Sequence, residues 1–195
     1  MRRLAQPALR RAIRLALPRR GGAILVLIAA AVILQGCGLI GSPPPPCPRV
    51  AIMDQAKTAT FFRDGPGRDL TDVTFEASII DLVGACDYDI DGDDSSVSLE
   101  YSVLFTATRG PAATSNQITV PFFVALADPE GGLVAKQVFE VQLVFPEYAV
   151  RVQSTEQIHQ EIPFNQAHHG ADYETFVGFQ LSRGQLEDLR RMRAN

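Results

Sequence analysis

Alternation of apolar and polar residues is the main pattern in the last two thirds of the chain. It is clearest over residues 97–107, where Val, Leu, Tyr, Val, Phe and Ala occupy every second position and mostly polar residues lie between them. A period of two residues is typical of a strand with one buried and one solvated face. The same alternation predicts further strands over residues 73–79, 139–145, 148–152 and 173–181, and a short strand near residues 58–62 would make seven.

A nearly continuous apolar run over residues 118–126 predicts one more strand, although Pro121 lies inside it. Proline cannot donate a ladder hydrogen bond, so we expect this strand at a sheet edge or at a bulge. The apolar residues from Val120 to Leu126 are explained either by packing in the core or by a surface for a partner. The cluster Asp128-Pro129-Glu130-Gly131-Gly132 that follows is typical of a turn.

These segments predict an all-β domain, because no long helical pattern separates them. Six or seven antiparallel strands joined by turns favour a β-sandwich, with an immunoglobulin- or fibronectin-like arrangement as the first expectation. A short helix is expected at the end, where Ser182 and Gln185 have the spacing of a capping box and Leu186, Leu189 and Met192 follow at near-helical spacing. The alternative for this segment is a solvated tail.

Residues 1–36 have a different character. Seven arginines precede an apolar run over residues 21–34, and the first acidic residue is Asp54. A basic stretch followed by about a dozen apolar residues is the layout of an export signal, whose basic end stays in the cytoplasm. The alternative is an uncleaved helix over residues 21–41, which would be long enough to span a bilayer and would leave the protein anchored in the inner membrane.

The end of this segment, Leu34-Gln35-Gly36-Cys37, resembles the lipobox of bacterial lipoproteins. The resemblance implies cleavage after Gly36 and a diacylglycerol on the Cys37 sulfur. Gly38 stands where an aspartate would imply retention in the inner membrane, so the resemblance implies an outer-membrane protein that faces the periplasm. Two or three acyl chains hold a protein stably at a membrane, at about 0.8 kcal/mol per buried methylene group.

Residues 37–48 are expected to form a tether and residues 49–195 the β-domain. Four consecutive prolines, residues 43–46, favour a semi-rigid polyproline II spacer between membrane and domain. The alternative is that these prolines are a ligand for a proline-recognising module.

The chain has three cysteines. If Cys37 carries lipid, Cys47 and Cys86 remain in an oxidising compartment, and we expect a disulfide between them. This bond would join the start of the domain to the loop before its central strands. The sequence contains no C-x-x-C motif, which is the motif that would indicate a redox-active pair.

Candidate sites for chemistry are few. The alternating carboxylates Asp87, Asp89, Asp91 and Asp93 include the D-x-D-x-D-G spacing of an EF-hand calcium loop, but Ser98 occupies the twelfth position in place of glutamate. The loop is therefore interpreted as an acidic hairpin or, alternatively, as a calcium site of another geometry.

The three histidines, His159, His168 and His169, lie between the last predicted strands, either as exposed loop residues or as zinc ligands. No G-x-S-x-G or S-x-x-K motif is present, and we expect no enzymatic activity.

Charge sharpens this picture. The whole chain carries 18 basic and 22 acidic residues, a formal charge of -4. Residues 1–36 contain seven of the basic residues and no acidic one, so residues 37–195 carry 11 basic and 22 acidic residues and a charge of -11. Such a surface excludes a general nucleic-acid binder, and it avoids anionic headgroups, so the membrane contact would come from the lipid.

Beyond the lipobox, the chain resembles uncharacterised envelope lipoproteins of alphaproteobacteria in Cys47-Pro48, Cys86 and Gln185-Leu186. That family implies no activity. We therefore expect a non-enzymatic, lipid-anchored envelope protein whose sandwich serves as a structural or interaction module for an envelope partner not identified by the sequence. The alternative is an envelope module that binds calcium or a small ligand through the loop from Asp87 to Asp94.

Overall fold

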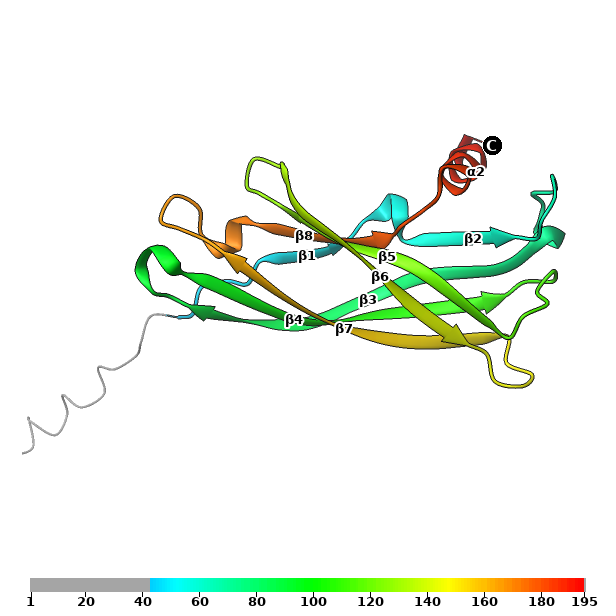
Figure 1. Ribbon diagram of the computed structural model, residues 1–195, viewed down its shortest axis with the longest axis horizontal. Helices are drawn as coiled ribbons and strands as arrows, with labels where there is room; N and C mark the ends of the chain where they lie inside the picture. Colours follow the sequence, from blue (N-terminus) through cyan, green and yellow to red (C-terminus); the bar gives the residue numbers. More distant parts are fainter. Residues whose placement is uncertain (1–42, 195) are drawn as a thin grey trace, which may run out of the picture. The chain divides into compact units, whose positions relative to one another are not determined.

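Eight strands in two four-stranded sheets make up most of the computed structural model, which describes residues 43–194 (Figure 1). One sheet has the order β1-β8-β5-β6 and the other the order β2-β3-β4-β7. All neighbouring strands are antiparallel except β1 and β8, which run parallel. The strands are β1 (Arg49–Ile52), β2 (Thr58–Phe62), β3 (Val73–Asp89), β4 (Ser96–Arg109), β5 (Gln117–Ala127), β6 (Leu133–Val144), β7 (Arg151–Pro163) and β8 (Glu174–Phe179).

Short helical segments connect or cap these strands. They are the 3₁₀ turns η1 (Asp54–Ala56), η2 (Leu70–Asp72), η3 (Gly92–Asp94) and η4 (Gly170–Asp172), and the helix α2 (Arg183–Ala194). The expected all-β sandwich with a short C-terminal helix is confirmed. Within residues 43–194, no helix combines the length and the hydropathy that a bilayer crossing requires. The expected export signal and Cys37 lie outside the described residues.

The core lies between the two sheets and is built from the inward positions of both. Phe105 of β4 contacts Phe122 of β5 and Phe179 of β8, with ring centroids 4.8 and 5.9 Å apart. All three side chains are almost fully buried, and each contributes about 1.5–3 kcal/mol through burial of apolar surface. The alternation seen over residues 97–107 is the β4 contribution to this core.

The order of the strands differs from the immunoglobulin order that strand counting suggested. In an immunoglobulin domain, the first, second, fourth and fifth strands share a sheet. Here β2, β3, β4 and β7 share a sheet, and β1 pairs with β8 in the other. The strand β1 was not expected at all, because its four residues are too few to show a period.

The expectation that Pro121 lies at a sheet edge is wrong. Pro121 lies in β5, which pairs with both β8 and β6 and is not an edge strand. The register shift in the β5–β6 pair lies between Leu126 and Ala127, so Pro121 is not at a bulge either. The Gln180 N–H donates to the Pro121 carbonyl, and pairing with β8 starts at the next residue, Phe122. Proline is tolerated here because it lies at the end of the β5–β8 ladder. It accepts the hydrogen bond from Gln180, and its missing N–H interrupts no paired residues further along.

The apolar run around Pro121 packs in the protein on both faces. Val120, Phe122, Val124 and Leu126 belong to the core between the sheets. Phe123 and Ala125 lie on the other face of β5, where Ala56 of η1 covers them. Core packing therefore accounts for this run, and it is not a surface for a partner.

Tyr148 does not start a strand, as its alternation with Val150 and Val152 suggested. It lies in the turn before β7 with a φ of 65° and an 89% exposed side chain. The strand begins at Arg151.

The capping box of the C-terminal helix is confirmed: the Gln185 N–H donates to the Ser182 hydroxyl, and the Gln185 side-chain oxygen accepts from the Ser182 N–H. The Arg68–Asp188 ion pair, with N–O atoms 3.1 Å apart, holds this helix beside the β2–β3 connection.

Candidate functional site: the disulfide end of the sandwich

The disulfide between Cys47 and Cys86 confirms the predicted pairing. Its two Cα atoms lie 5.7 Å apart, across 39 residues of sequence. Cys86 was expected in a loop, but it lies inside β3 opposite Leu99 of β4. The bond therefore joins the residues before β1 to an edge of the other sheet, and it closes the sandwich where β1 and β3 face each other.

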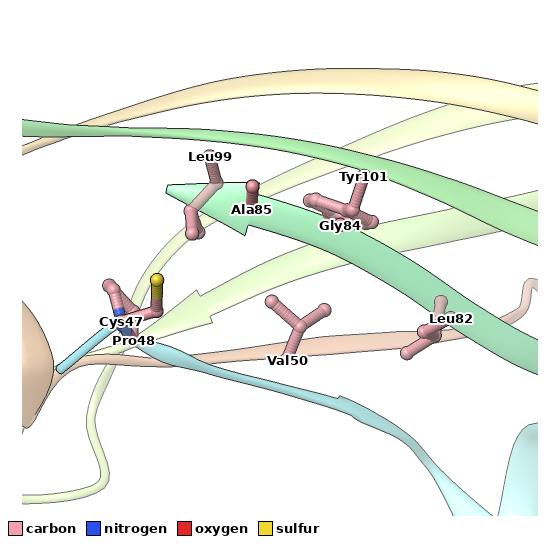
Figure 2. Close-up of a pocket in the computed structure, with 8 residues that line it drawn as sticks. All are labelled: Cys47, Pro48, Val50, Leu82, Gly84, Ala85, Leu99 and Tyr101. Atoms are coloured by element: carbon pink, nitrogen blue, oxygen red, sulfur yellow. The ribbon is translucent and has the colours of Figure 1, made fainter. Parts of the chain in front are cut away.

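A small cavity of about 140 Å³ lies beside the disulfide (Figure 2). It opens between β1 and β3, because β2 pairs with β3 only as far as Ser78. Val50 and Leu82 lie on the facing strands in Figure 2. The remaining walls come from the disulfide segment, β3 and β4, with the residues Cys47, Pro48, Gly84, Ala85, Leu99 and Tyr101.

Tyr101 is the polar side chain of this cavity. It is only 4% exposed, and its hydroxyl has no hydrogen-bond partner among the described residues. Burial raises the pKa of the Tyr101 phenol well above its ordinary value. Opposite Tyr101 on β3 is Gly84, where a Cβ atom would overlap with the Tyr101 Cβ and the Glu100 carbonyl. The absence of a side chain at Gly84 thus permits this close approach of β3 and β4.

The edge of β3 that β2 leaves open is capped by its own aspartates. The Asp81 side chain accepts a hydrogen bond from the Leu82 N–H at 2.9 Å, and the Asp87 side chain accepts one from the Tyr88 N–H at 3.1 Å. Charged side chains on an exposed edge oppose the addition of a further strand. We conclude that this edge is protected against uncontrolled pairing.

A larger groove of about 490 Å³ lies at the β3–β4 hairpin, and we call it the Tyr88 groove. It is lined by three parts of the chain: the residues before the disulfide (Pro45, Pro46), the hairpin (Tyr88, Ile90, Gly92, Ser95) and the β7–β8 connection (Phe164, Asn165, Gln166, His169, Gly170, Ala171). The volume is within the range of sites for small molecules and peptide side chains, about 300–1,000 Å³.

The two aromatic rings of the groove are held by their surroundings. Tyr88 and Phe164 meet edge to face with ring centroids 5.7 Å apart. Gly170 lies beneath them, because a Cβ there would lie 2.8 Å from the Tyr88 ring and 3.2 Å from that of Phe164. The Tyr88 hydroxyl donates a 2.7 Å hydrogen bond to the Pro46 carbonyl. Burial, followed by the negative charge of Asp172, raises the pKa of the Tyr88 phenol, so it stays a donor at neutral pH.

The predicted calcium residues are distributed over the end of β3 and the turn that follows it. Asp87 and Asp89 lie in β3, Asp91 precedes η3, and Asp93 lies within η3. The side chain of Asp93 is not among those that the structure describes. Among the described residues, no three His, Cys, Asp or Glu side chains come together as a metal site. Calcium binding by this hairpin stays a prediction.

The three histidines face three different carboxylates. His159 lies in β7 and not in a loop, 3.6 Å from Glu100. His168 is 3.7 Å from Glu130, and His169 is 3.7 Å from Asp172. The three histidines therefore lie beside three different carboxylates, and the structure does not place them together as ligands of one metal ion.

The sequence analysis did not predict the contact between Tyr88 and Phe164. The signal available was an aromatic residue between Asp87 and Asp89, but its partner lies 76 residues later. No family model, curated protein or solved structure matches this chain.

Proposed function

We propose that this protein is a non-enzymatic, lipid-anchored envelope protein that faces the periplasm from the outer membrane. The observation that carries the proposal is the Cys47–Cys86 disulfide. Disulfides persist in oxidising compartments such as the bacterial periplasm. The bond also uses Cys47 and Cys86, which leaves Cys37 of the lipobox-like sequence as the remaining thiol for acylation.

The sandwich is proposed to serve as a protein-interaction or structural module. Exposed apolar side chains on the edge strand β6 support this role: Leu133, Val134 and Val138 are 68%, 54% and 50% exposed. Apolar groups at a sheet edge are a common feature of contact surfaces. The charge of -11 on residues 37–195 opposes direct binding to anionic headgroups and makes the lipid the membrane contact.

The anchor is tested by Cys37→Ser in cells fed a clickable palmitate analogue. We expect loss of acyl labelling and release of the protein from the membrane fraction. A Cys47→Ser, Cys86→Ser double variant is the matched control, and it should still incorporate the label. Undiminished labelling of the Cys37→Ser protein would contradict the proposal.

The export step has a separate test, since alkylation of intact cells reports which thiols are free. In the native protein we expect Cys47 and Cys86 to resist alkylation until a reductant is added. Full alkylation of both thiols without reductant would show that the domain does not reside in an oxidising compartment.

The interaction role is tested by photo-crosslinking in living cells from Val138, which is half exposed on β6. A discrete crosslinked partner is expected from this position. The control position is Asp64, an exposed residue of the β2–β3 connection. Equal crosslinking patterns from both positions would contradict a specific surface on β6.

A further inference from the structure

The Tyr88 groove already contains the kind of contact that recognises polyproline. Polyproline II segments have few N–H groups, so they are recognised through ring faces and carbonyl oxygens in grooves lined by aromatic residues. In this protein the Tyr88 hydroxyl binds the Pro46 carbonyl at 2.7 Å, and Pro45 lines the groove beside Pro46. The chain therefore places its own prolines against part of an aromatic surface.

The groove is larger than these two prolines require. Pro45 and Pro46 form one wall, and a volume of about 490 Å³ is bounded by them, by Phe164 and by Ile90. Ile90 is 66% exposed and lines the groove, so its aliphatic side chain is available for contact with a ligand. The Cys47–Cys86 disulfide and the close packing at Gly170 hold the walls in place. A ligand would therefore meet a preformed surface.

The charge next to the groove defines the flanks of such a ligand. Asp91 stands between Ile90 and Gly92, which both line the groove, and Asp87 and Asp89 lie on the strand that leads to it. None of these three carboxylates forms an ion pair within the described part of the chain. Complementary charge on a partner increases the association rate and fixes its register.

We propose that the Tyr88 groove binds a proline-rich segment with basic flanking residues, carried by an envelope partner. Proline rings pack against Tyr88, Phe164 and Ile90, and lysine or arginine residues on the flanks pair with the hairpin carboxylates. This proposal names a partner class for the interaction role above and rests on that role, and it adds a second contact surface, because no residue of β6 lines the groove. It also gives the acidic hairpin a function that does not require calcium.

Peptide binding by the full-length protein in detergent tests the proposal. The probe is a fluorescein-labelled tetraproline peptide flanked by arginines, and the measurement is fluorescence anisotropy. We expect saturable binding that weakens roughly tenfold in Ile90→Ser, since the contact of one aliphatic side chain is lost. Val150→Ser is the matched control, because Val150 is 63% exposed but lies before β7, outside the groove.

The charge contribution is tested by Asp89→Asn with Asp91→Asn, which should weaken binding and reduce its dependence on salt. Asp64→Asn is the control, because Asp64 is exposed on the connection at the opposite end of β3. A glycine–serine peptide with the same arginine flanks should bind much more weakly than the tetraproline peptide.

Three results would each overturn the proposal. These are no anisotropy change of the peptide when the protein is added in large excess, equal binding of the glycine–serine peptide, and undiminished binding by Ile90→Ser. The peptide assay does not depend on acylation, so the Cys37→Ser protein should bind like the wild type. The lipid-anchor proposal and the peptide-binding proposal are thus tested in separate experiments, and either can fail without the other.

Discussion

Cys47 and Cys86 connect the two sheets at the edge where no strand pairing joins them. Cys47 precedes β1 of one sheet, and Cys86 lies in β3 of the other. The bond closes a loop with a sequence separation of 39 residues. A cross-link of this span restricts the unfolded chain, and its removal costs about 2–4 kcal/mol.

We therefore expect the Cys47→Ser, Cys86→Ser variant to unfold at a lower urea concentration, with a loss of about 2–4 kcal/mol. Reductant should produce a similar loss in the wild type and no further loss in the variant. A reductant effect of equal size in both proteins would mean that the disulfide is not its target.

Gly84→Ala is expected to destabilise the fold by about 1–3 kcal/mol, because the added methyl group overlaps with Tyr101 and Glu100 of β4. Gly184→Ala is the control. It lies in the first turn of α2, where a Cβ would make only an ordinary contact of 4.0 Å with the Ser182 hydroxyl, and alanine there should stabilise the helix by about 0.5–1 kcal/mol. Thermal unfolding measures both changes. A melting temperature that falls in Gly84→Ala and rises in Gly184→Ala would support the close approach of β3 and β4 at Gly84.

Tyr101→Phe is expected to stabilise the protein by about 1 kcal/mol, because it removes a buried hydroxyl that has no partner among the described residues. Urea denaturation measures this change. Tyr148→Phe, at an exposed position, should leave stability unchanged. A clear loss of stability in Tyr101→Phe would mean that the hydroxyl has a bound partner.

The raised pKa of Tyr101 adds a pH dependence with a definite sign. In the unfolded chain the Tyr101 phenol ionises near pH 10, whereas in the folded protein it stays protonated at that pH. Its contribution to the free energy of unfolding is therefore fully present below pH 10 and is lost as the pH rises above that value. The Tyr101→Phe variant should therefore lose less stability than the wild type in alkaline solution. Parallel losses in the two proteins would contradict a buried phenol.

Asp72 is a buried carboxylate that forms an ion pair with Arg63 and accepts a hydrogen bond from the Asp69 N–H. Asp72→Ala leaves that N–H without its side-chain acceptor, so we expect a loss of about 1–3 kcal/mol in urea denaturation. Asp54→Ala is the matched control, since the Asp54–Lys57 pair is exposed and its loss should change stability by less than about 0.5 kcal/mol.

Asp69 gives a test at acidic pH. The Thr71 hydroxyl and then the Thr71 N–H donate to its carboxylate, and together they lower the pKa of Asp69 below its ordinary value of 3.8. The contribution to stability is present above that value and is lost as the pH falls through the folded-state pKa. In Thr71→Val, a carboxyl NMR titration should show the Asp69 pKa moving back up. An unchanged titration midpoint would contradict the hydroxyl as the cause.

The position of β2 was predictable from a short local segment, whereas β3 was expected to end at Ile79 and continues to Asp89. The reason is a bulge at Ile80, where the register moves from Ile79 opposite Phe105 to Asp81 opposite Leu104. One extra residue reverses which positions point inward, so a single period cannot describe the whole strand.

The candidate site was less predictable than the fold. The pairing of Cys47 with Cys86 was deduced from the number of cysteines and the expected compartment. The approach of Phe164 to Tyr88 was not predictable, because it depends on how the β7–β8 connection folds back over the hairpin. Pairings between distant segments leave no period in the sequence.

The sequence by itself determined the presence of seven of the eight strands, the capped C-terminal helix and the two cysteines that join, because these follow from side-chain alternation, local hydrogen bonding and residue count. The tertiary structure decided the sheet order, the parallel pairing of β1 with β8 and the aromatic groove beside Pro46. Those features depend on which distant surfaces bury each other most completely, and that is a property of the packed whole.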